Sequence, residues 1–403
     1  MRRGYLSQYF DGVAIKRLSA VEADETRSNQ HEYNATRPML EFMGRPTDAT
    51  RLDTRFIYLD DDAEPVVTDA FLTLYDSRAN HPTRTEYRFY FPTTPVSERA
   101  SEGDLLVVAK AQAGNMLVVV ASGGSSAAQQ MAWLFDHDSE LPGFSVRSNF
   151  DTERDQIGFA AYFILENIGV EIEVSDDIFL EEMLNRFGGR FPKTSEFSRF
   201  ARNTLPEISA ADDPDSALMA WMEREERLFR VLERHLIAGR LEQGFLPDRV
   251  EEFIGFSLSV QNRRKSRVGL ALENHVESVF VALGIRFSRT AVTENRAKPD
   301  FLLPGKAEYD DATFDSLRLT MLGVKSTCKE RWRQVLAEAD RIPRKHLLTL
   351  EPSISTGQTD EMRAKGLQLI VPGGLQSTFS EAQKAWLLDV RSFTRLVLNR
   401  QAA

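Results

Sequence analysis

The chain has 403 residues, of which 42% are hydrophobic and 27% charged, and its formal net charge is −10 at pH 7. This composition excludes collagen-like, coiled-coil and fully disordered proteins, and the length suggests about two or three domains. The single cysteine, Cys328, excludes an internal disulfide framework and a cysteine-rich zinc module, and it fits a reducing cytosol.

No apolar run follows the basic amino terminus, so we expect no signal peptide. The first part of the chain instead carries short strand-like segments separated by polar loops. Residues 112–115, Gln-Ala-Gly-Asn, lie between two Val-rich runs and favour a hairpin. These features predict a β-barrel or sandwich. Its predicted strands are residues 55–59, 70–75, 87–91, 105–109 and 116–121.

Residues 122–126, Ser-Gly-Gly-Ser-Ser, superficially resemble a phosphate-binding loop. They lack the Gly-Lys-Ser/Thr ending that such a loop needs, so we interpret them as an ordinary loop. From about residue 145 to residue 180 the pattern is irregular and acidic. We therefore place a domain connection there, between one domain at residues 1–170 and another at residues 180–403.

The second domain mixes helices with strands. Helical periodicity predicts helices over residues 217–236 and 268–283, and an apolar stripe at helical spacing covers residues 332–342. Three acids in the turn at residues 212–215 could imitate a metal-binding loop, but a helix cap is the favoured interpretation. Short apolar runs predict buried strands, and the alternation indicates an α/β fold. These strands are residues 301–303, 319–324, 347–350 and 367–371.

Charge is unevenly distributed along the chain. The net negative charge argues against a nucleic acid partner, because phosphates require cationic surface. Residues 262–267, however, hold four cations in six positions, and residues 329–333 read Lys-Glu-Arg-Trp-Arg. Because binding is local, these clusters locate a candidate nucleic acid site. A solvated helix start is the alternative interpretation of the first cluster.

Asp300 opens one predicted strand, and Lys325 ends the next. A carboxylate and a lysine on neighbouring strand ends suit metal-dependent phosphodiester hydrolysis. The carboxylate holds a divalent cation that neutralises phosphate charge and acidifies water, while the lysine orients that water and supplies positive potential. Taken singly, each residue is more simply a turn residue or a solvated strand end.

One carboxylate is few for Mg²⁺, which is usually held by one or two carboxylates together with waters and substrate phosphate. Gly323, two residues before the lysine, has no side chain with which to ligate. We expect Glu338, thirteen residues after Lys325 on the following helix, to replace the missing acid, although it could simply pair with Arg341. Glu273 and Glu277, four residues apart on the earlier helix, offer one more carboxylate.

Five segments of the second half form a recognisable set: SVQNRRKSR at 259–267, KPDFL at 298–302, VKSTCKERWRQ at 324–334, AEAD at 337–340 and LIVP at 369–372. Together they resemble the EcoRII family of restriction endonucleases. The resemblance covers most of residues 180–403, and Ile15 to Ala20 (IKRLSA) match well in the more diverged first half. It implies two domains: an amino-terminal B3-like β-pseudobarrel and a carboxy-terminal α/β nuclease of the PD-(D/E)XK fold.

The resemblance also implies residue roles. Asp300 and Glu338 would be metal ligands, Lys325 the catalytic lysine, Glu273 the supporting acid and Glu277 a less favoured substitute. A base-reading segment would suit G·C pairs, because Arg contacts guanine O6 and N7 while Glu accepts from cytosine N4. The expected DNA contacts of this domain are Arg263, Arg264 and Lys265 on the backbone or minor groove, and Lys329, Glu330, Arg331 and Arg333 around the bases.

In the family the amino-terminal domain grips a second, effector copy of the site between two arms. His31 falls in the first arm, and residues 83–88 (TRTEYR) resemble the second. Pro82 and Tyr87 stand where the family carries lysines, and Thr36 stands where an aromatic residue is expected, so effector specificity is less well defined than catalysis. The expected effector contacts are Lys16, His31, Arg84, Glu86 and Arg88.

The resemblance thus implies a Mg²⁺-dependent, site-specific double-strand DNA endonuclease that cuts CCWGG or a close variant and leaves 5′-phosphate and 3′-hydroxyl ends. A palindromic site implies a two-fold homodimer. A cognate DNA methyltransferase and a bacterial cytoplasmic location would follow. The alternatives are a catalytically silent DNA-binding regulator, a strand exchanger that uses Tyr309 as its nucleophile, and a resolvase of the same fold.

Overall fold

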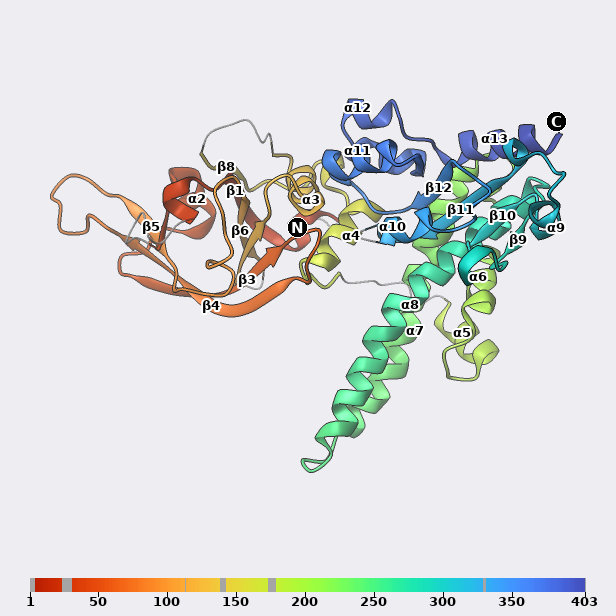
Figure 1. Cartoon of the computed structure of the whole chain (residues 1–403). Helices are drawn as coiled ribbons and strands as arrows, with labels where there is room; N and C mark the ends of the chain where they lie inside the picture. Colours follow the sequence, from red (N-terminus) through yellow and green to blue (C-terminus); the bar gives the residue numbers. More distant parts are fainter. Residues whose placement is uncertain are drawn as a thin grey trace. The chain divides into compact units, whose positions relative to one another are not determined.

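The computed structural model describes residues 4–23, 31–112, 114–137, 143–172, 179–328 and 331–402 (Figure 1). The chain divides into two compact units. Unit 1 comprises Met1–Ile172 and Pro352–Gln358, and unit 2 comprises Glu173–Glu351 and Thr359–Ala403. None of the helices in the described ranges is long and apolar enough to cross a bilayer.

Unit 1 is built on one eight-stranded sheet with the order β2-β5-β4-β3-β7-β6-β1-β8. Neighbouring strands are antiparallel except β3 and β7, which are parallel. The five predicted strands and the hairpin between the last two are confirmed, whereas the B3-like pseudobarrel remains a prediction. The strands are β1 (Phe10–Arg17), β2 (Glu32–Asn34), β3 (Thr50–Leu59), β4 (Val66–Asp76), β5 (Tyr87–Tyr90), β6 (Leu105–Ala111), β7 (Met116–Ala121) and β8 (Ser145–Arg147).

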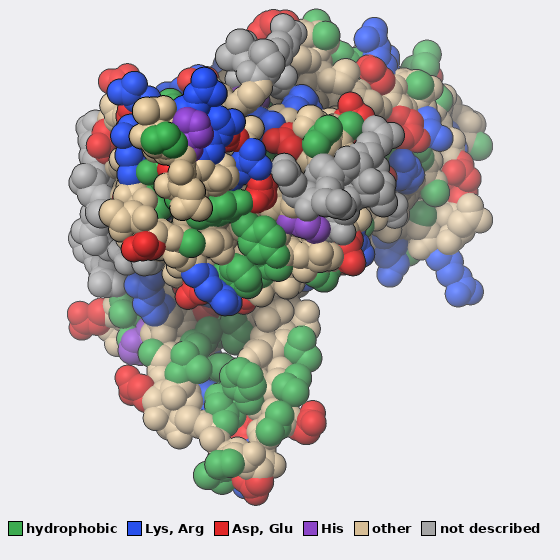
Figure 2. Space-filling model, turned by 90° about the vertical axis from the view of Figure 1, so that its left-hand side faces the viewer, with side chains coloured by type: hydrophobic (Ala, Val, Ile, Leu, Met, Phe, Trp, Pro, Cys, Tyr) green, Lys and Arg blue, Asp and Glu red, His purple; other side chains and the backbone are tan. Residues whose placement is uncertain are grey.

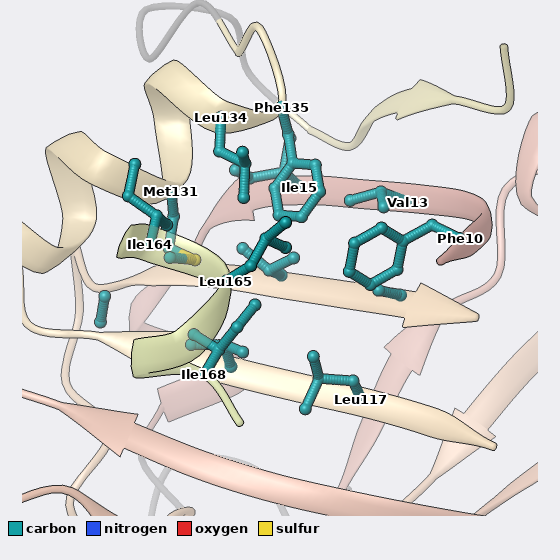
Figure 3. Close-up of a cluster of buried hydrophobic side chains, with 14 of the residues drawn as sticks. Phe10, Val13, Ile15, Leu117, Met131, Leu134, Phe135, Ile164, Leu165 and Ile168 are labelled. Carbon is teal, nitrogen blue, oxygen red and sulfur yellow. The ribbon is translucent and has the colours of Figure 1, made fainter. Parts of the chain in front are cut away.

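Both faces of the sheet are buried along its central strands β6 and β7. Val13 and Ile15 of β1 point into a cluster closed by α3 (Ser126–Leu134) and α4 (Phe159–Asn167) (Figure 3). Ala14 points to the opposite face, where α2 (Arg37–Met43) packs. Alternate residues of a strand face opposite sides, so a strand covered on both sides needs an unbroken apolar run. This is why β6 and β7 are so uniformly apolar.

The stretch expected to be an irregular connection is partly regular. Residues 145–172 contain β8 and α4, and Ile164 and Leu165 of α4 are fully buried in the core of unit 1. The glycine-containing loop at 122–126 is an ordinary loop, as predicted, and the Ser125 hydroxyl caps α3 by accepting from the Ala128 amide. The remaining short helices of unit 1 are η1 (Leu6–Gln8), α1 (Ala20–Ala23) and η2 (Glu153–Asp155).

Unit 2 contains a mixed five-stranded sheet with the order β13-β12-β11-β10-β9. β10 is antiparallel to both β9 and β11, whereas β11, β12 and β13 run parallel. The start of β10 and the end of β11 therefore meet at the same edge. The strands are β9 (Ser288–Arg289), β10 (Phe301–Leu303), β11 (Thr320–Lys325), β12 (Lys345–Thr349) and β13 (Leu367–Ile370).

Two long helices, α7 (Pro214–Gln243) and α8 (Val250–Ala282), form a hairpin that extends away from this sheet (Figure 1). Both are longer than predicted: α7 continues past residue 236 to Gln243, and α8 begins at Val250, well before residue 268. The basic cluster at 262–267 therefore lies inside a helix and not at a solvated helix start. The Asp213 carboxylate caps α7, and Asp215 accepts from the backbone amides of Val390 and Arg391, so these acids do not form a metal loop.

The far end of the α7–α8 hairpin exposes hydrophobic side chains, which are visible in the lower, protruding part of Figure 2. Exposed apolar patches of this kind are typical of interaction surfaces. The exposed residues are Leu241, Leu246, Val250, Phe253, Ile254 and Leu258. The other helices described between residues 179 and 402 are α5 (Leu180–Phe187), α6 (Thr194–Asn203), η3 (Glu294–Arg296), α9 (Lys306–Asp310), η4 (Ser316–Arg318), α10 (Arg331–Leu336), α11 (Thr356–Ala364), η5 (Gly373–Thr378), α12 (Glu381–Lys384) and α13 (Val390–Ala402).

The apolar stripe at residues 332–342 is only partly helical. α10 ends at Leu336, and Ala339 has a φ of +52°, which lies outside the helical region. Lys345 donates from Nζ to the carbonyl oxygens of Glu338 and Ala339, so these buried acceptors are satisfied without a helix. The prediction that Glu338 lies on a helix was therefore wrong: it lies in the turn that follows α10.

Candidate functional site

Asp300 and Lys325 meet at one edge of the unit 2 sheet. Asp300 directly precedes β10, and Lys325 is the last residue of the antiparallel strand β11. The Lys325 Nζ lies 2.9 Å from Asp300 Oδ2, which also accepts the Val324 amide at 2.6 Å. The side chains are 22% and 13% exposed respectively, so the ion pair is half-buried and its charges are less screened than those of a surface pair.

Close packing explains why no acid stands two residues before this lysine. A Cβ atom added at Gly323 would lie 2.8 Å from Cγ2 of Val335 in α10. That is too close for any side chain, so α10 can cover β11 only where the strand has a glycine. A second carboxylate has to come from another segment, and the turn after α10 supplies Glu338.

Glu338 is electrostatically coupled to the ion pair. Burial raises the pKa of its carboxyl group, and the negative charge of Asp300 raises it further, while Lys325 and Lys345 act in the opposite direction. Its Oε2 atom is buried and has no hydrogen-bond partner among the described residues. A buried acceptor without a partner is costly, so this oxygen is suited to bind a ligand.

Glu273 approaches the same edge from α8. Burial is the main cause that raises the pKa of Glu273, the charge of Asp300 adds to it, and Arg289 opposes it. Glu277, one turn further along α8, is bound to Arg289 and is 39% exposed. The structure therefore brings Asp300, Lys325, Glu338 and Glu273 into one electrostatic group and leaves Glu277 at its margin.

The donor set at this edge consists of carboxylate oxygens, which Mg²⁺ prefers. Oε2 of Glu338 has no hydrogen-bond partner among the described residues, and the charge of Asp300 acts on the same carboxyl group, so the two carboxylates are candidates to hold one cation. Among the residues that the structure describes, His, Cys, Asp and Glu side chains do not form a group of three or more arranged to hold a metal ion. That Asp300 and Glu338 are the metal ligands stays a prediction.

The raised pKa of Glu338 predicts a pH-dependent gain in stability from Glu338→Gln. The folded protein binds this proton more tightly than the unfolded chain, so ionisation destabilises the fold as the pH rises from 4.5, the ordinary value, through the raised pKa. At pH 8 in EDTA, the Gln variant is expected to have the larger free energy of unfolding by urea titration. Below the ordinary pKa, the difference is expected to disappear.

The exposed Glu381 offers a control, because Glu381→Gln removes a carboxylate that is 91% exposed. We expect this variant to match the wild type at both pH values. Equal stability of Glu338→Gln and wild type at pH 8 would show that ionisation of the Glu338 carboxyl group does not destabilise the folded protein.

Tyr309 is unsuited to be a nucleophile. It is 3% exposed, and its hydroxyl donates to Glu294 Oε2 at 2.5 Å. Burial and this hydrogen bond raise the pKa of the phenol well above its usual value. Because a phenolate would be needed for attack, the strand-exchange alternative is disfavoured.

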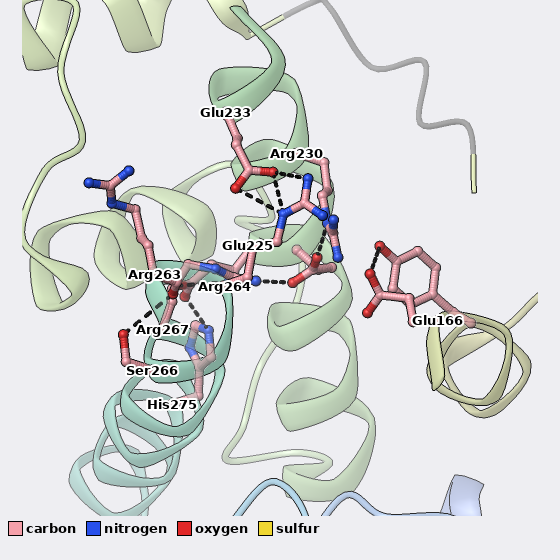
Figure 4. A network of polar contacts seen from close by, with 11 residues as sticks. Glu166, Glu225, Arg230, Glu233, Arg263, Arg264, Ser266, Arg267 and His275 are labelled. Atoms are coloured by element: carbon pink, nitrogen blue, oxygen red, sulfur yellow. Dashed lines mark hydrogen bonds and ion pairs between the residues drawn. The ribbon is translucent and has the colours of Figure 1, made fainter. Parts of the chain in front are cut away.

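The basic cluster of α8 is largely engaged within unit 2. Arg264 binds the buried Glu233, with Nη2 2.7 Å from Oε2, and the Arg263 guanidinium lies 4.1 Å from the Phe191 ring centre (Figure 4). Arg267 is buried against Glu226 and Glu225. Lys265 is exposed. Of the predicted contacts on α8, Lys265 is therefore the most accessible to DNA, and Arg264 also has a structural role.

The predicted base-reading segment is described only in part. Lys329 and Glu330 lie outside the described residues. Arg331 and Arg333, on α10, are both exposed, and Arg333 Nη2 lies 3.0 Å from Glu361 Oε2. Arg331 follows the predicted catalytic strand closely, so its exposed guanidinium lies on an element that packs directly on β11.

Most predicted effector residues of unit 1 are in ion pairs. Lys16 Nζ lies 2.7 Å from Glu22, and Arg88 bridges Glu32 and Glu86 at 2.7 Å each. The His31 ring stacks edge-on against Phe91. His31 directly precedes β2, and Arg88 lies on the neighbouring strand β5, whereas Lys16 lies on β1, which four strands separate from β5 in the sheet order.

Arg84 is exposed in the loop from β4 to β5. This loop lies at the left end of Figure 1 and therefore faces the viewer in Figure 2, where Lys and Arg side chains gather with a histidine on one part of the face. The same loop carries the exposed Arg78 and His81. An exposed basic loop is suited to approach phosphates.

Two residues that the sequence did not single out belong to the site. Arg289 binds Glu273, and Lys345 holds the backbone of Glu338 in place. Neither lies in a recognisable motif. The only signal is for Lys345, a cation two residues before the predicted strand at 347–350; the structure extends this strand back to Lys345, where a buried lysine requires a partner.

Residues 229–394 match a family model described as EcoRII C terminal. Over 205 residues, covering 51% of this chain and 50% of the relative, the chain is 42% identical to the type II restriction enzyme EcoRII of Escherichia coli. The chain thus spans about half the length of the curated relative that it matches. The carboxy-terminal part is therefore EcoRII-like, as the motifs predicted.

Two solved structures are also similar. Metal-depleted Ecl18kI in complex with uncleaved DNA has a TM-score of 0.45 at 16% identity, covering 56% of this chain and 84% of that chain. The restriction endonuclease PspGI–substrate DNA complex has a TM-score of 0.44 at 17% identity, covering 57% of this chain and 98% of that chain.

Proposed function

We propose that this chain is a Mg²⁺-dependent, site-specific double-strand DNA endonuclease of the EcoRII-like type. The observation that carries the proposal is the placement of Asp300, Lys325 and the partnerless Glu338 carboxylate at one sheet edge. The 42% identity to a type II restriction enzyme supports the same reaction and the PD-(D/E)XK fold of residues 180–403.

In this mechanism Asp300 and Glu338 hold the cation. When bound, Mg²⁺ neutralises phosphate charge and acidifies a water molecule. Lys325 donates from Nζ to orient the attacking water and stabilises the negative charge that develops on the phosphate. Glu273 supports the site as an additional carboxylate. The half-buried position of the group strengthens each of these electrostatic effects.

We propose that residues 329–331 read G·C pairs of CCWGG or a close variant. Arg331→Ala is then expected to cost about 1–3 kcal/mol of discrimination at one G·C pair, because a bidentate contact to guanine O6 and N7 is lost. The measurement is the ratio of cleavage rates on the cognate site and on sites altered at single positions.

Arg344→Ala is a suitable control, because Arg344 is an exposed arginine of unit 2 outside the proposed reading segment. It is expected to leave the ratio unchanged. If Arg331→Ala also leaves the relative cleavage of altered sites unchanged, Arg331 does not read a base.

The further proposed partners follow from the reaction. A palindromic site requires one active site per strand, hence a homodimer. Residues 1–170 would form a B3-like effector domain that binds a second copy of the site through Lys16, His31, Arg84, Glu86 and Arg88. A DNA methyltransferase would protect host DNA in the bacterial cytoplasm.

The direct test is digestion of phage DNA by the purified protein in Mg²⁺, followed by sequencing of the fragment ends. We expect 5′-phosphate ends at one short sequence, and no cleavage in EDTA. A sequence-specific gel shift without cleavage in Mg²⁺ or Mn²⁺ would favour a DNA-binding regulator. Cleavage of branched DNA without sequence preference would favour a resolvase.

A further inference from the structure

Arg289 connects α8 to the strand that follows Asp300. Its Nη2 lies 2.9 Å from Glu273 Oε2, and its Nη1 lies 2.6 Å from Glu277 Oε2. Nη1 also lies 3.2 Å from the Asn274 side-chain oxygen. The guanidinium is therefore held by three neighbouring side chains of one helix.

The backbone of Arg289 is held in place by the pairing of β9 with β10. Arg289 pairs with Phe301 across β9 and β10, and its guanidinium lies 5.6 Å from the Phe301 ring centre. The next residue, Thr290, donates its amide to the Asp300 carbonyl at 3.2 Å. Arg289 thus joins the two segments that carry Glu273 and Asp300.

The charges at this edge require such a cation. Lys325 is bound to Asp300, and the negative charge of Asp300 raises the pKa of both Glu273 and Glu338. Like charges at short range repel one another, and the repulsion is strong where burial reduces screening. Arg289 offsets part of it beside Glu273, and its planar fork also fixes the direction of that carboxylate, which a lysine would not do.

We propose that Arg289 is a positioning residue that orients the Glu273 carboxylate towards Asp300 and thereby strengthens divalent cation binding at the Asp300–Glu338 site. The inference rests on the proposed function and extends it to a residue that would contact neither DNA nor the cation. Glu277 anchors Arg289 from the other side, because its Oε2 lies 2.6 Å from Nη1 of Arg289.

The experiment is a calorimetric titration of the full chain with Mn²⁺ in the absence of DNA, together with the Mn²⁺ dependence of cleavage. Arg289→Gln is expected to raise the Kd for Mn²⁺ by up to about 10–100-fold, the range found when outer partners of a metal site are lost. Saturating Mn²⁺ is expected to restore kcat, and KM for DNA is expected to stay unchanged. Arg289→Lys keeps the charge but not the planar guanidinium. Its Kd for Mn²⁺ is expected to lie between those of the wild type and Arg289→Gln.

Arg286→Gln is the matched control, because Arg286 lies three residues before Arg289, is 59% exposed and pairs with Glu308. It is expected to bind Mn²⁺ as the wild type does. Urea unfolding of each variant separates a loss of folding from a loss of cation affinity, and Glu277→Gln, which keeps the Arg289–Glu273 pair, is expected to have the smaller effect on Kd.

An unchanged Kd in folded Arg289→Gln would overturn the inference and leave the proposed nuclease intact. A tighter Kd would also overturn it, because Arg289 would then compete with the cation for Glu273. The proposed function fails if the wild type neither cuts DNA nor binds Mn²⁺ at a site that Asp300→Asn removes. The inference then fails with it.

Discussion

Lys325→Ala is expected to reduce DNA cleavage by about 10²–10³-fold, the loss found when one group that stabilises transition-state charge is removed. Lys325 is the cation closest to Asp300, at 2.9 Å, and its side chain is only 22% exposed. Without it, no ammonium group stabilises the developing charge or orients the water. The measurement is the single-turnover rate on a short duplex in saturating Mg²⁺.

Lys306→Ala provides the control, because Lys306 is a more exposed lysine of unit 2 that pairs with Asp310 within α9. We expect it to cut DNA at the wild-type rate. Binding in Ca²⁺, measured by gel shift, is expected to remain in Lys325→Ala. Equal cleavage by Lys325→Ala and wild type would remove the lysine from the mechanism.

Arg267→Ala is expected to lower the free energy of unfolding by about 3–5 kcal/mol, because it removes the guanidinium beside the fully buried Glu225 carboxylate. Arg267 is buried on α8, bound to Glu226 and 3.8 Å from Glu225, which is fully buried on α7 (Figure 4). Its guanidinium also lies 4.0 Å from the Phe229 ring centre. The measurement is urea unfolding monitored by circular dichroism at pH 8.

Lys265→Ala is the matched control, since Lys265 lies two residues away on the same helix and is exposed. Its effect is expected to stay within about 0.5 kcal/mol, as is usual for surface positions. For DNA binding we expect the larger effect from Lys265→Ala, which should weaken the affinity for all sequences alike. Equal stability of the two variants would show that Arg267 is not needed to neutralise Glu225 and Glu226.

The local environment of Glu225 also includes His275. The His275 Nε2 lies 2.9 Å from Glu225 Oε2, and Nδ1 lies 3.0 Å from Arg202 Nη1. Burial lowers the pKa of this histidine. A neutral imidazole does not neutralise the carboxylate, which is why Arg267 is expected to dominate the stability of this pair of helices.

The sequence by itself predicted many of the strands and proposed the residues of the candidate site. Short apolar and aromatic runs predicted five of the eight strands of unit 1, because burial of a strand's faces shows directly in its sequence. Asp300 and Lys325 could be paired in advance, since each stands at the end of an apolar strand. The resemblance of residues 180–403 then supplied roles that spacing alone left open.

Helix lengths were harder to predict from the sequence. The first half of α8 carries polar residues and an exposed apolar face, so its periodicity does not show one buried side. The cluster at 262–267 looks like solvated surface in the sequence, and only the packing of α7 against α8 buries Arg267. Glu225 and Arg267 lie far apart in the sequence, so a local pattern does not predict their contact.

Only the tertiary structure decided how the second carboxylate reaches the site. The stripe at 332–342 has helical spacing, yet Lys345, from the next strand, holds the carbonyl groups of Glu338 and Ala339 in a turn. Arg289 likewise becomes part of the site only when β9 pairs beside β10. Contacts between residues distant in the chain depend on packing, and a local sequence pattern records burial but not the partner.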